Sequence, residues 1–336
     1  MLARRIGIDI GTATTRVVTR AEGIVLEEPT VVAMTDGDRR LPEAVGREAV
    51  RLQVRHPAGV RLSWPLAGAR VVEAQALDLL LQHYVTRVSG HQRLFRPDVM
   101  VSIPSGLRSG DRRRVLAAVT AAGARTVHLI DAPLAAGIGA GLPTQSSRGS
   151  LVVHLGAGVS DVAVLSRDGT IAHEACPICG RDLDRQVAER VLALHRVRIA
   201  DEVAEQLKCE VALAPGTRGA SALAVSGSEP GSERARTVTV RSEDLAPVGE
   251  ALVERLAQVV ERVLRGTPPG LRAAVRERGV TMTGGAARLR GLGPALGARL
   301  QLAVTVPSAP DRCVALGTGR ALERLEVPGR QLLYIR

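Results

Sequence analysis

The hydrophobic and polar positions of the chain repeat one layout twice. Arg5–Val18 and Leu151–Val164 each consist of a β-rich apolar run, a glycine-containing turn and a second β-rich run. A polar turn follows each one, at Arg20–Gly23 and Arg167–Gly169, and then a third short apolar run. The pattern predicts two similar β-meanders, one in each half of a duplicated structure.

Helical periodicity lies between and after the two meanders. The predicted amphipathic helices are Val72–Val88, Ser109–Ala122, Leu183–His195, Asp201–Val211, Ser242–Arg265 and Gly291–Leu300. Short strands are predicted at Val99–Ile103 and Val280–Thr283. Alternating strands and helices over 336 residues predict an α/β fold with two domains and a cleft between them. The polar segment Leu142–Gly149 is the predicted linker, and Ser226–Glu233 is a predicted surface loop.

Composition narrows the class of protein. The formal net charge is +11, but Lys208 is the only lysine, and the arginines are scattered without aromatic partners that could stack on bases. We therefore expect no nucleic-acid partner and favour an anionic membrane surface. Of the four cysteines, only Cys176 and Cys179 have a ligand-like or redox-like spacing, and reduced thiols are expected. The sequence has neither a signal peptide nor an apolar run long enough to span a membrane, which predicts a cytoplasmic protein.

Two glycine turns are the strongest candidates for a site. The turns that begin at Gly11 and Gly156 would leave backbone N–H groups facing phosphate oxygens without an intervening Cβ. One turn from each half could hold a polyphosphate between the domains. Asp9, just before the first turn, would then hold magnesium through water. Either turn alone is also compatible with an ordinary hairpin.

Two further features fit a nucleotide site. Gly284 and Gly285 occupy a strand-to-helix turn that would let a base or ribose approach the backbone, although a plain connection explains it equally well. Glu205 and Lys208 lie at i and i+3 on one helical face, which is more commonly a surface ion pair. The chain uses arginine almost everywhere else, so a single lysine indicates a position that requires a compact ammonium.

At these residues the sequence resembles the MreB family of the actin-like ATPase superfamily. The resemblance runs from Ile6 to about Leu325. The segments that carry it are Gly7–Thr14, Gly23–Pro29, Ile103–Gly106, Ala135–Pro143, Arg278–Gly285 and Cys313–Gly319. It implies an actin-like (ribonuclease H-like) duplicated two-domain α/β fold with an interdomain cleft for ATP or GTP and magnesium. The expected domains are residues 1–144 plus 314–336, with a small subdomain at about 33–70, and residues 145–313, with one at about 181–248.

The resemblance also assigns roles. It implies that the first loop binds phosphate and magnesium, that the second binds the terminal phosphates, that Glu205 and Lys208 contact the nucleoside, and that Gly284–Gly285 is the adenosine motif. Arg16 adds a cation near the first loop. The predicted cofactor-binding residues are Asp9, Gly11, Thr12, Ala13, Thr14, Arg16, Gly156, Ala157, Gly158, Val159, Glu205, Lys208, Gly284, Gly285 and Ala286, with Asp9 also the metal ligand.

The chain departs from the family pattern where hydrolysis would occur. His154 stands where the family has Asp, Ala157 where it has Gly, and Val159 where it has Thr. Ala132 replaces the Glu that orients the attacking water. Asp131 and Ser160 remain as candidate catalytic residues. Loss of the acid–base group alone predicts a rate lower by on the order of 10²–10⁴, so hydrolysis is expected to be weak or lost.

The chain's only Phe lies in a Leu94–Phe95 pair between Arg93 and Arg96. An apolar tip framed by cations suits an anionic membrane, and some MreB proteins insert a hydrophobic loop at the matching position. The alternative is a residue that caps the local core.

The leading hypothesis is a filament-forming scaffold that resembles Mbl or an actinobacterial MreB. It would polymerise on the inner membrane face and organise cell-wall synthesis and cell shape. A polymerisation-coupled ATPase that uses Asp131 or His154 is one alternative. A monomeric nucleotide-dependent adaptor of a membrane or division complex is the other.

Overall fold

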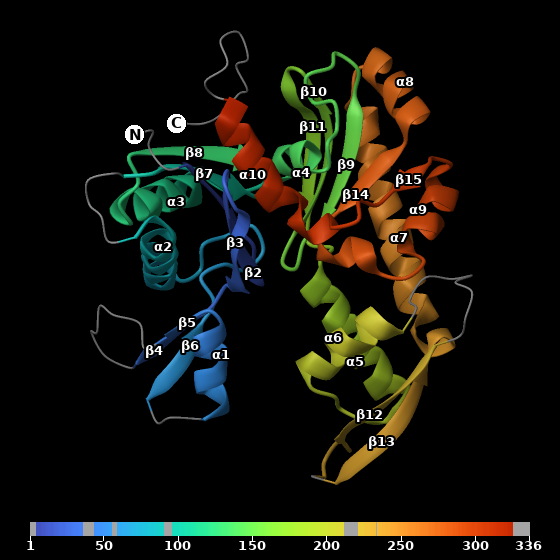
Figure 1. Ribbon diagram of the computed structural model, residues 1–336. Helices are drawn as coiled ribbons and strands as arrows, with labels where there is room; N and C mark the ends of the chain where they lie inside the picture. Colours follow the sequence, from blue (N-terminus) through green and yellow to red (C-terminus); the bar gives the residue numbers. More distant parts are fainter. Residues whose placement is uncertain are drawn as a thin grey trace. The chain divides into compact units, whose positions relative to one another are not determined.

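Two five-stranded sheets of the same strand order organise the protein (Figure 1). The computed structural model describes residues 5–35, 44–55, 59–90, 96–211, 221–232 and 234–324. The chain divides into two units. Unit 1 comprises Met1–Ser147, Leu165–Ile171 and Arg312–Arg336, and unit 2 comprises Arg148–Val164 and Ala172–Asp311. Each unit is described by itself below.

The sheet of unit 1 has the order β3-β2-β1-β7-β8. Its strands are β1 (Arg5–Ile10), β2 (Thr14–Thr19), β3 (Gly23–Pro29), β7 (Asp98–Ile103) and β8 (Thr126–Asp131). The first three are joined by short turns and therefore pair antiparallel, whereas β7 and β8 run parallel to β1. This is the first of the two predicted meanders, extended by two parallel strands.

Helices cover both faces of this sheet. The buried side chains of α2 (Ala74–Ser89) and α3 (Ser109–Ala121) form one core cluster with Ile6 and Ile8 of β1. Side chains alternate along a strand, so Gly7 faces the other way, where a Cβ would meet Thr318 of α10 (Cys313–Arg324). Helix α10 packs in turn on α4 (Ala132–Gly139).

A second, small sheet also belongs to unit 1. Strands β4 (Val32–Thr35), β5 (Ala44–Val45) and β6 (Val60–Ser63) pair in the order β5-β4-β6, and α1 (Arg47–Val54) packs on them. The small core includes the fully buried Val31, Ala33 and Ala49.

The sheet of unit 2 has the order β11-β10-β9-β14-β15. Its strands are β9 (Ser150–Leu155), β10 (Ser160–Ser166), β11 (Gly169–Cys176), β14 (Val280–Thr283) and β15 (Val304–Thr305). As β7 does with β1, β14 lies parallel to β9, and β15 lies parallel to β14. The order repeats that of unit 1 strand for strand, which confirms the predicted duplication and the α/β class.

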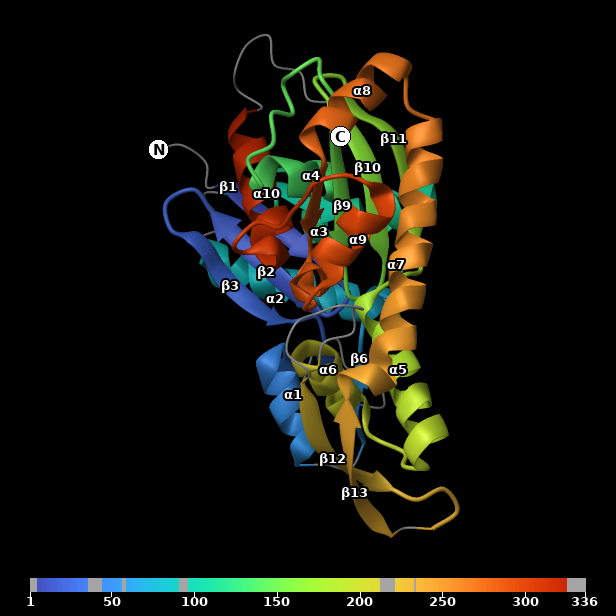
Figure 2. The same cartoon turned by 90° about the vertical axis from the view of Figure 1, so that its right-hand side faces the viewer.

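Helices and one hairpin complete unit 2 (Figure 2). The helices are α5 (Gly180–His195), α6 (Asp201–Glu210), α7 (Ser242–Arg265), α8 (Pro269–Arg278) and α9 (Leu292–Leu300), with single 3₁₀ turns η1 (Gly285–Arg288) and η2 (Pro310–Arg312), the latter spanning the unit boundary. The long helix α7 buries one face, including Leu245, Leu252 and Leu256, against the core. Strands β12 (Ala222–Ser228) and β13 (Ala235–Arg241) form an antiparallel hairpin.

The structure confirms the six predicted helices and both predicted strands, with ends shifted by three residues at most. One local prediction is partly wrong. Residues 226–228 do not belong to a surface loop but end strand β12, where Ser226 and Ser228 pair with Thr237 and Ala235 of β13. Polar residues are tolerated there because most side chains of this hairpin are exposed. Among the described residues, no helix is long and apolar enough to cross a membrane.

Candidate functional site

The first glycine loop of unit 1 is a tight turn between β1 and β2. The N–H of Gly11 donates to the carbonyl of Thr14 at 3.1 Å. A Cβ on Gly11 would lie 2.7 Å from that same oxygen, so only glycine fits without a shift. The hydroxyl of Thr30 donates to the Gly11 carbonyl at 2.7 Å. Thr12 is buried, Thr14 is partly buried, and Ala13 is exposed at the tip of the turn.

The second glycine loop, between β9 and β10 in unit 2, has the same closure. The N–H of Gly156 donates to the carbonyl of Val159 at 3.1 Å, and a Cβ on Gly156 would lie 2.5 Å from that oxygen. Two N–H groups at the start of α5 hold the loop from outside. Gly180 donates to the Gly156 carbonyl and Arg181 donates to the Ala157 carbonyl, both at 2.9 Å. Ala157, Gly158 and Val159 are all partly exposed.

The residue two positions before the first glycine of each loop contacts a hydroxyl group on the neighbouring parallel strand. Asp9 accepts a hydrogen bond from Ser102 Oγ at 2.8 Å, and Ser102 is its register partner on the neighbouring parallel strand β7. Burial raises the pKa of Asp9 to about 6, against the lowering effects of Ser102 and Arg16. In unit 2, His154 Nδ1 lies 3.1 Å from the hydroxyl of Thr283, its register partner on the parallel strand β14.

Arg16, the predicted cation near the first loop, is engaged with a carboxylate. Its guanidinium lies 2.9 Å from Glu27 on β3, and Nε donates to the same carboxylate at 3.1 Å. Arg312 reaches the other oxygen of Glu27 at 3.1 Å. Arg16 would have to leave this network, or extend from it, to contact a phosphate.

Lys208 pairs with a residue that the sequence pattern did not indicate. Its ammonium lies 2.6 Å from Asp184 on α5 and donates to the carbonyl of Gly180 at 3.3 Å. Lys208 is 7% exposed, whereas Glu205 is exposed on α6. Burial raises the pKa of Asp184, although the hydrogen bond from Lys208 favours the ionised form. Lys208 therefore lies beside the second loop, because the N–H of Gly180 donates to Gly156.

The third turn lies against the same loop. Gly284 has a φ of +89°, and a Cβ there would lie 2.2 Å from the carbonyl oxygen of Leu155, just before the second loop. Its N–H donates to Pro310 at 2.7 Å. No atom lies near the Cβ position of Gly285, which leaves open space beside it. Ala286 follows it in the 3₁₀ turn η1.

The two candidate catalytic residues are both occupied with protein partners. Asp131 ends β8 and lies 3.6 Å from the guanidinium of Arg112, which also donates to the carbonyls of Ser105 and Leu107. Ala132, which follows it, is 8% exposed. Ser160 is fully buried, and its hydroxyl donates to the carbonyl of Ile178.

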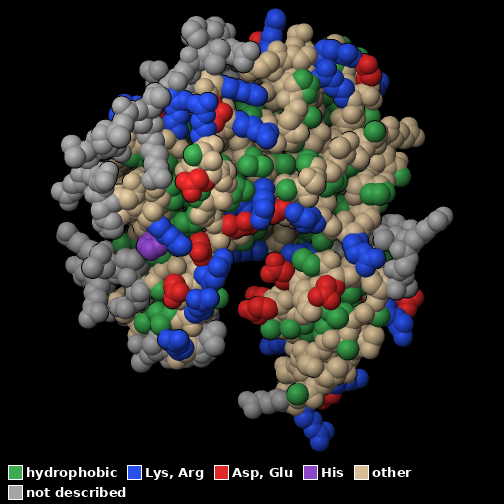
Figure 3. All heavy atoms as spheres, viewed as in Figure 1, with side chains coloured by type: hydrophobic (Ala, Val, Ile, Leu, Met, Phe, Trp, Pro, Cys, Tyr) green, Lys and Arg blue, Asp and Glu red, His purple; other side chains and the backbone are tan. Residues whose placement is uncertain are grey.

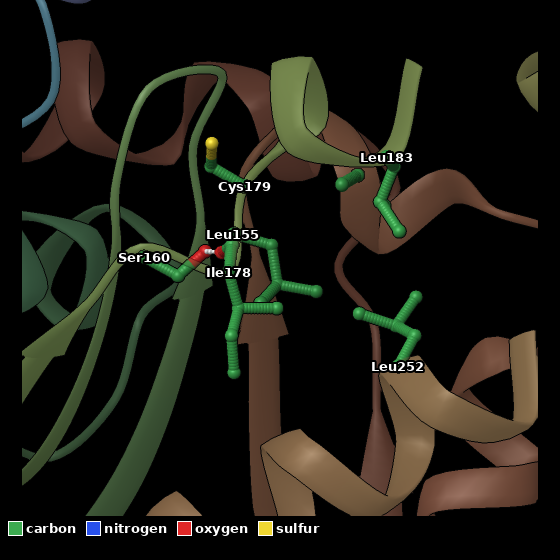
Figure 4. Close-up of a pocket in the computed structure, with 7 residues that line it drawn as sticks. Leu155, Ser160, Ile178, Cys179, Leu183 and Leu252 are labelled. Carbon is green, nitrogen blue, oxygen red and sulfur yellow. Dashed lines mark hydrogen bonds between the residues drawn. The ribbon is translucent and has the colours of Figure 1, made fainter. Parts of the chain in front are cut away.

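A pocket beside Ser160 does not supply a ligand site (Figure 4). It is lined by Leu155, Ser160, Ile178, Cys179, Leu183, Leu252 and Ala286. The empty space amounts to about 180 Å³, but none of it has room for a water molecule. Burial raises the pKa of the Cys179 thiol, as it does for Cys176, so both thiols stay protonated near neutral pH. The pocket is a packing gap in the core of unit 2.

Unit 2 thus brings together most of its predicted residues: the second loop, Lys208 and the Gly284 turn. Unit 1 brings Asp9 and Arg16 next to the first loop. The supporting partners Thr30, Ser102, Asp184 and Thr283 were missed, since they come from distant segments. Ser102 and Thr283 could have been found only by aligning the predicted parallel strands, because each lies directly opposite the residue that it contacts. Leu94 and Phe95 lie outside the described residues.

Charged side chains of both signs are interspersed over the face shown in Figure 3. The arginines of the described residues include several in ion pairs, such as Arg288 with Asp311, and Arg47 with Glu28. These ion pairs therefore neutralise part of the positive charge that the arginines carry.

Comparison with known proteins identifies the family. The family profile described as "MreB/Mbl protein" matches residues 3–329. The chain belongs to the MreB/Mbl family. It is 32% identical over 336 residues to the cell shape-determining protein Mbl of Bacillus subtilis (strain 168), covering 99% of this chain and 100% of Mbl. It is 33% identical over 341 residues to the cell shape-determining protein MreB of Escherichia coli (strain K12), covering 99% and 97%.

Solved structures of related proteins establish the fold of this family member. MreB5 of Spiroplasma citri bound to ADP matches with a TM-score of 0.88 at 22% identity, over 97% of this chain and 99% of that one. The MamK double helical filament matches with a TM-score of 0.80 at 20% identity, over 96% and 100%. The predicted actin-like fold is confirmed.

Proposed function

We propose that this MreB/Mbl family member binds a nucleoside triphosphate at its glycine loops and assembles into filaments that organise cell shape. The observation that carries the proposal is the pair of glycine turns at Gly11 and Gly156, closed by the same 3.1 Å hydrogen bond. Free backbone N–H groups in such turns bind anions well. Each of the two turns would therefore offer such groups to a phosphate.

The nucleoside end would lie against unit 2. Lys208 and the open side of Gly285 both lie next to the second loop or its flanking strand, which suits a ribose and base that continue from the phosphates. Glu205 is exposed on the same helix as Lys208 and can turn toward a ligand. The related MreB5 of Spiroplasma citri was solved with ADP, which supports a nucleotide here. ATP is the proposed nucleotide, with GTP as the competitor to be tested.

A magnesium ion fits the first loop better than the second. Asp9 supplies one carboxylate next to Gly11, which is enough for an ion held through water and shared with phosphates. At the matching position, His154 supplies a nitrogen, a poorer ligand for magnesium. Among the described residues, no cluster of three or more His, Cys, Asp or Glu side chains is placed to hold a metal ion. Asp9 would therefore be the ligand that orients magnesium.

Hydrolysis is proposed to be weak or lost. Ala132 has no group that can polarise water, and Asp131, the nearest carboxylate in sequence, lies beside the cation of Arg112. Ser160 has its hydroxyl committed to a buried carbonyl. None of these side chains is in place to act as a general base, so nucleotide would bind and stay intact.

Filament formation and membrane contact complete the proposal. Head-to-tail contacts between copies of one chain produce open filaments. The likeness to the MamK filament and the cell shape-determining names of Mbl and MreB support this role. Leu94 and Phe95, between arginines, would contact the inner membrane face, and many copies in a filament would multiply a weak contact. Cell-wall synthesis or division machinery is the proposed partner.

Nucleotide binding and pelleting test the function together. Fluorescent ATP and GTP analogues are titrated against the purified chain, and filaments are pelleted with nucleotide and anionic liposomes. We expect nucleotide binding and nucleotide-dependent pelleting of filaments. The Phe95→Ala variant is expected to form filaments that pellet without the liposomes. Binding without pelleting at any concentration would favour the monomeric adaptor. Unchanged liposome pelleting by Phe95→Ala would remove the membrane assignment.

Phosphate release under polymerising conditions tests the hydrolysis claim. We expect a rate close to a blank without protein, and no further change on Asp131→Ala. A rate well above the blank that is lost on Asp131→Ala would establish the active ATPase instead.

A further inference from the structure

A row of polar side chains crosses the sheet of unit 1 beside the first loop. The residues that lie directly opposite one another on β7, β1, β2 and β3 are Ser102, Asp9, Arg16 and Glu27. Side chains at directly opposed positions of neighbouring strands share one face of a sheet. Arg312 extends the row, because its guanidinium lies 3.1 Å from the Glu27 carboxylate. From Asp9 onward, the row therefore alternates between carboxylates and guanidinium groups.

Glu27 binds two cations and uses a different oxygen for each. Arg16 lies 2.9 Å from Oε1, and its Nε donates to the same oxygen at 3.1 Å. Arg312 lies 3.1 Å from Oε2. The side chain of Arg16 is 13% exposed, whereas that of Arg312 is 50% exposed. One carboxylate thus holds an inner cation, on the strand that follows the first loop, and an outer cation that is open to solvent.

We propose that Arg312 frees Arg16 for the phosphates of the nucleotide by keeping Glu27 paired. This inference rests on the proposed nucleotide site. A phosphate at the first loop attracts Arg16, but a departing guanidinium would leave a partly buried carboxylate without a cation, which opposes the move. With Arg312 in place, Glu27 keeps one cation throughout, so Arg16 can turn to the ligand. Arg312 is a positioning residue, since it acts through Glu27 and not on the ligand.

The charges next to Arg16 oppose the shift until a ligand is present. Without one, Asp9 and Glu27 flank Arg16 on both sides, and both attract it. With magnesium bound as proposed, Asp9 would attract Arg16 less, while the phosphates would attract it more. Arg16 has further interactions, so the proposal concerns only its share in Glu27. Asp9 and Arg16 then serve different parts of one ligand, the cation and the anion.

The primary experiment compares the ATP affinity of the parent chain with that of Arg312→Gln, using a fluorescent ATP analogue with magnesium. We expect the variant to bind about three- to fivefold more weakly, which is the full strength of a solvent-exposed ion pair. Arg87→Gln is the matched control, since it removes the same charge from Glu28, the next residue on β3, and Arg87 is 59% exposed. The control should bind as the parent does. A loss of less than about twofold in Arg312→Gln would overturn the proposal.

Further variants test the route through Glu27. Arg312→Lys keeps the cation and should bind as the parent does. Glu27→Gln removes the charge that retains Arg16, so ATP affinity is expected to stay equal or to rise, whether or not Arg312 is also replaced. Arg16→Gln is expected to weaken binding, and adding Arg312→Gln to it should have no further effect. Weaker binding by Glu27→Gln alone, or a further loss in the Arg16→Gln background, would refute the proposed route.

The outcomes separate this inference from the function on which it rests. A parent chain that binds neither ATP nor GTP refutes the nucleotide site, and with it the role of Arg312. A parent chain that binds ATP while Arg312→Gln binds equally well keeps the site and refutes only the inference. A thermal melt of each variant excludes misfolding as the cause of any loss. Recovery of affinity when Glu27→Gln is added to Arg312→Gln excludes it independently.

Discussion

The first and second glycine loops are closed by the same turn but are held by different parts of the molecule. Gly11 is held by the hydroxyl of Thr30, which follows the meander to which the loop itself belongs. Gly156 is held by the start of α5, and Lys208 of α6 donates to the same residue, Gly180. The first loop is thus held by the residue that directly follows its own meander, whereas the second is held by helices inserted between β11 and β12.

The two loops therefore differ in which parts of the molecule can shift them. The brace of the first loop comes from a residue close to it in the chain. A loop braced by two helices moves when those helices move, so a ligand at the second loop and the position of α5 and α6 influence each other. The second loop would therefore be the one that couples the proposed nucleotide site to α5 and α6.

The largest expected effect comes from adding a methyl group to either loop. Gly11→Ala and Gly156→Ala place a Cβ 2.7 and 2.5 Å from a carbonyl oxygen, and each is expected to lower the free energy of unfolding by roughly 3 kcal/mol. Gly110→Ala and Gly270→Ala, which have open space, are the controls in the same units. Denaturant melts measure all four. A neutral Gly156→Ala would mean that the turn closes differently from the first.

The second effect concerns catalysis. Ala132→Glu combined with His154→Asp restores a water-orienting acid and a carboxylate at the second loop, and phosphate release is expected to rise by on the order of 10² or more. Each single variant should gain less, because both groups act on the same water. The measurement is phosphate release with magnesium at saturating ATP. No gain in the double variant would show that other residues limit hydrolysis.

The third effect isolates the brace of the second loop. Lys208→Met removes the ammonium from a largely buried ion pair with Asp184, which is expected to cost roughly 2 kcal/mol of stability because a carboxylate stays behind without its partner. The double variant Lys208→Met with Asp184→Leu is expected to recover most of that loss. Equal instability of single and double variants would mean that the pair itself is not what stabilises α5 on α6.

The last effect appears only when the pH is changed and concerns the first loop. The pKa of Asp9 is about 6 in the folded chain against an ordinary 3.8, so ionising it opposes folding, and stability is lost as the pH rises from about 4 through 6. Asp9→Asn keeps an acceptor for Ser102 and removes this loss. Without metal, the variant is expected to be more stable than the parent by up to about 3 kcal/mol near pH 8, which is the full value of this shift, and equal near pH 4.

Local sequence predicted the turns and the helices because both depend on neighbouring residues. Gly11 and Gly156 are recognisable from the repeated pattern around them, and α7 from its apolar stripe. The partner of Lys208 was not predictable in that way. The i, i+3 spacing pointed to Glu205, but the structure pairs Lys208 with Asp184 because α5 and α6 pack together. Thr30 and Thr283 were missed for the same reason, since each acts across strands that sequence spacing does not connect.

The position of Lys208 has a practical consequence. It is the only lysine among 336 residues, and 7% of it is exposed. Amine-directed reagents therefore have a single side-chain target in this protein, and it is shielded while α5 and α6 stay together. Acylation of that one amine, followed by mass spectrometry, would report how often the helices separate, with no engineered label. A ligand that keeps the two helices together would be detected because it lowers the acylation rate of Lys208.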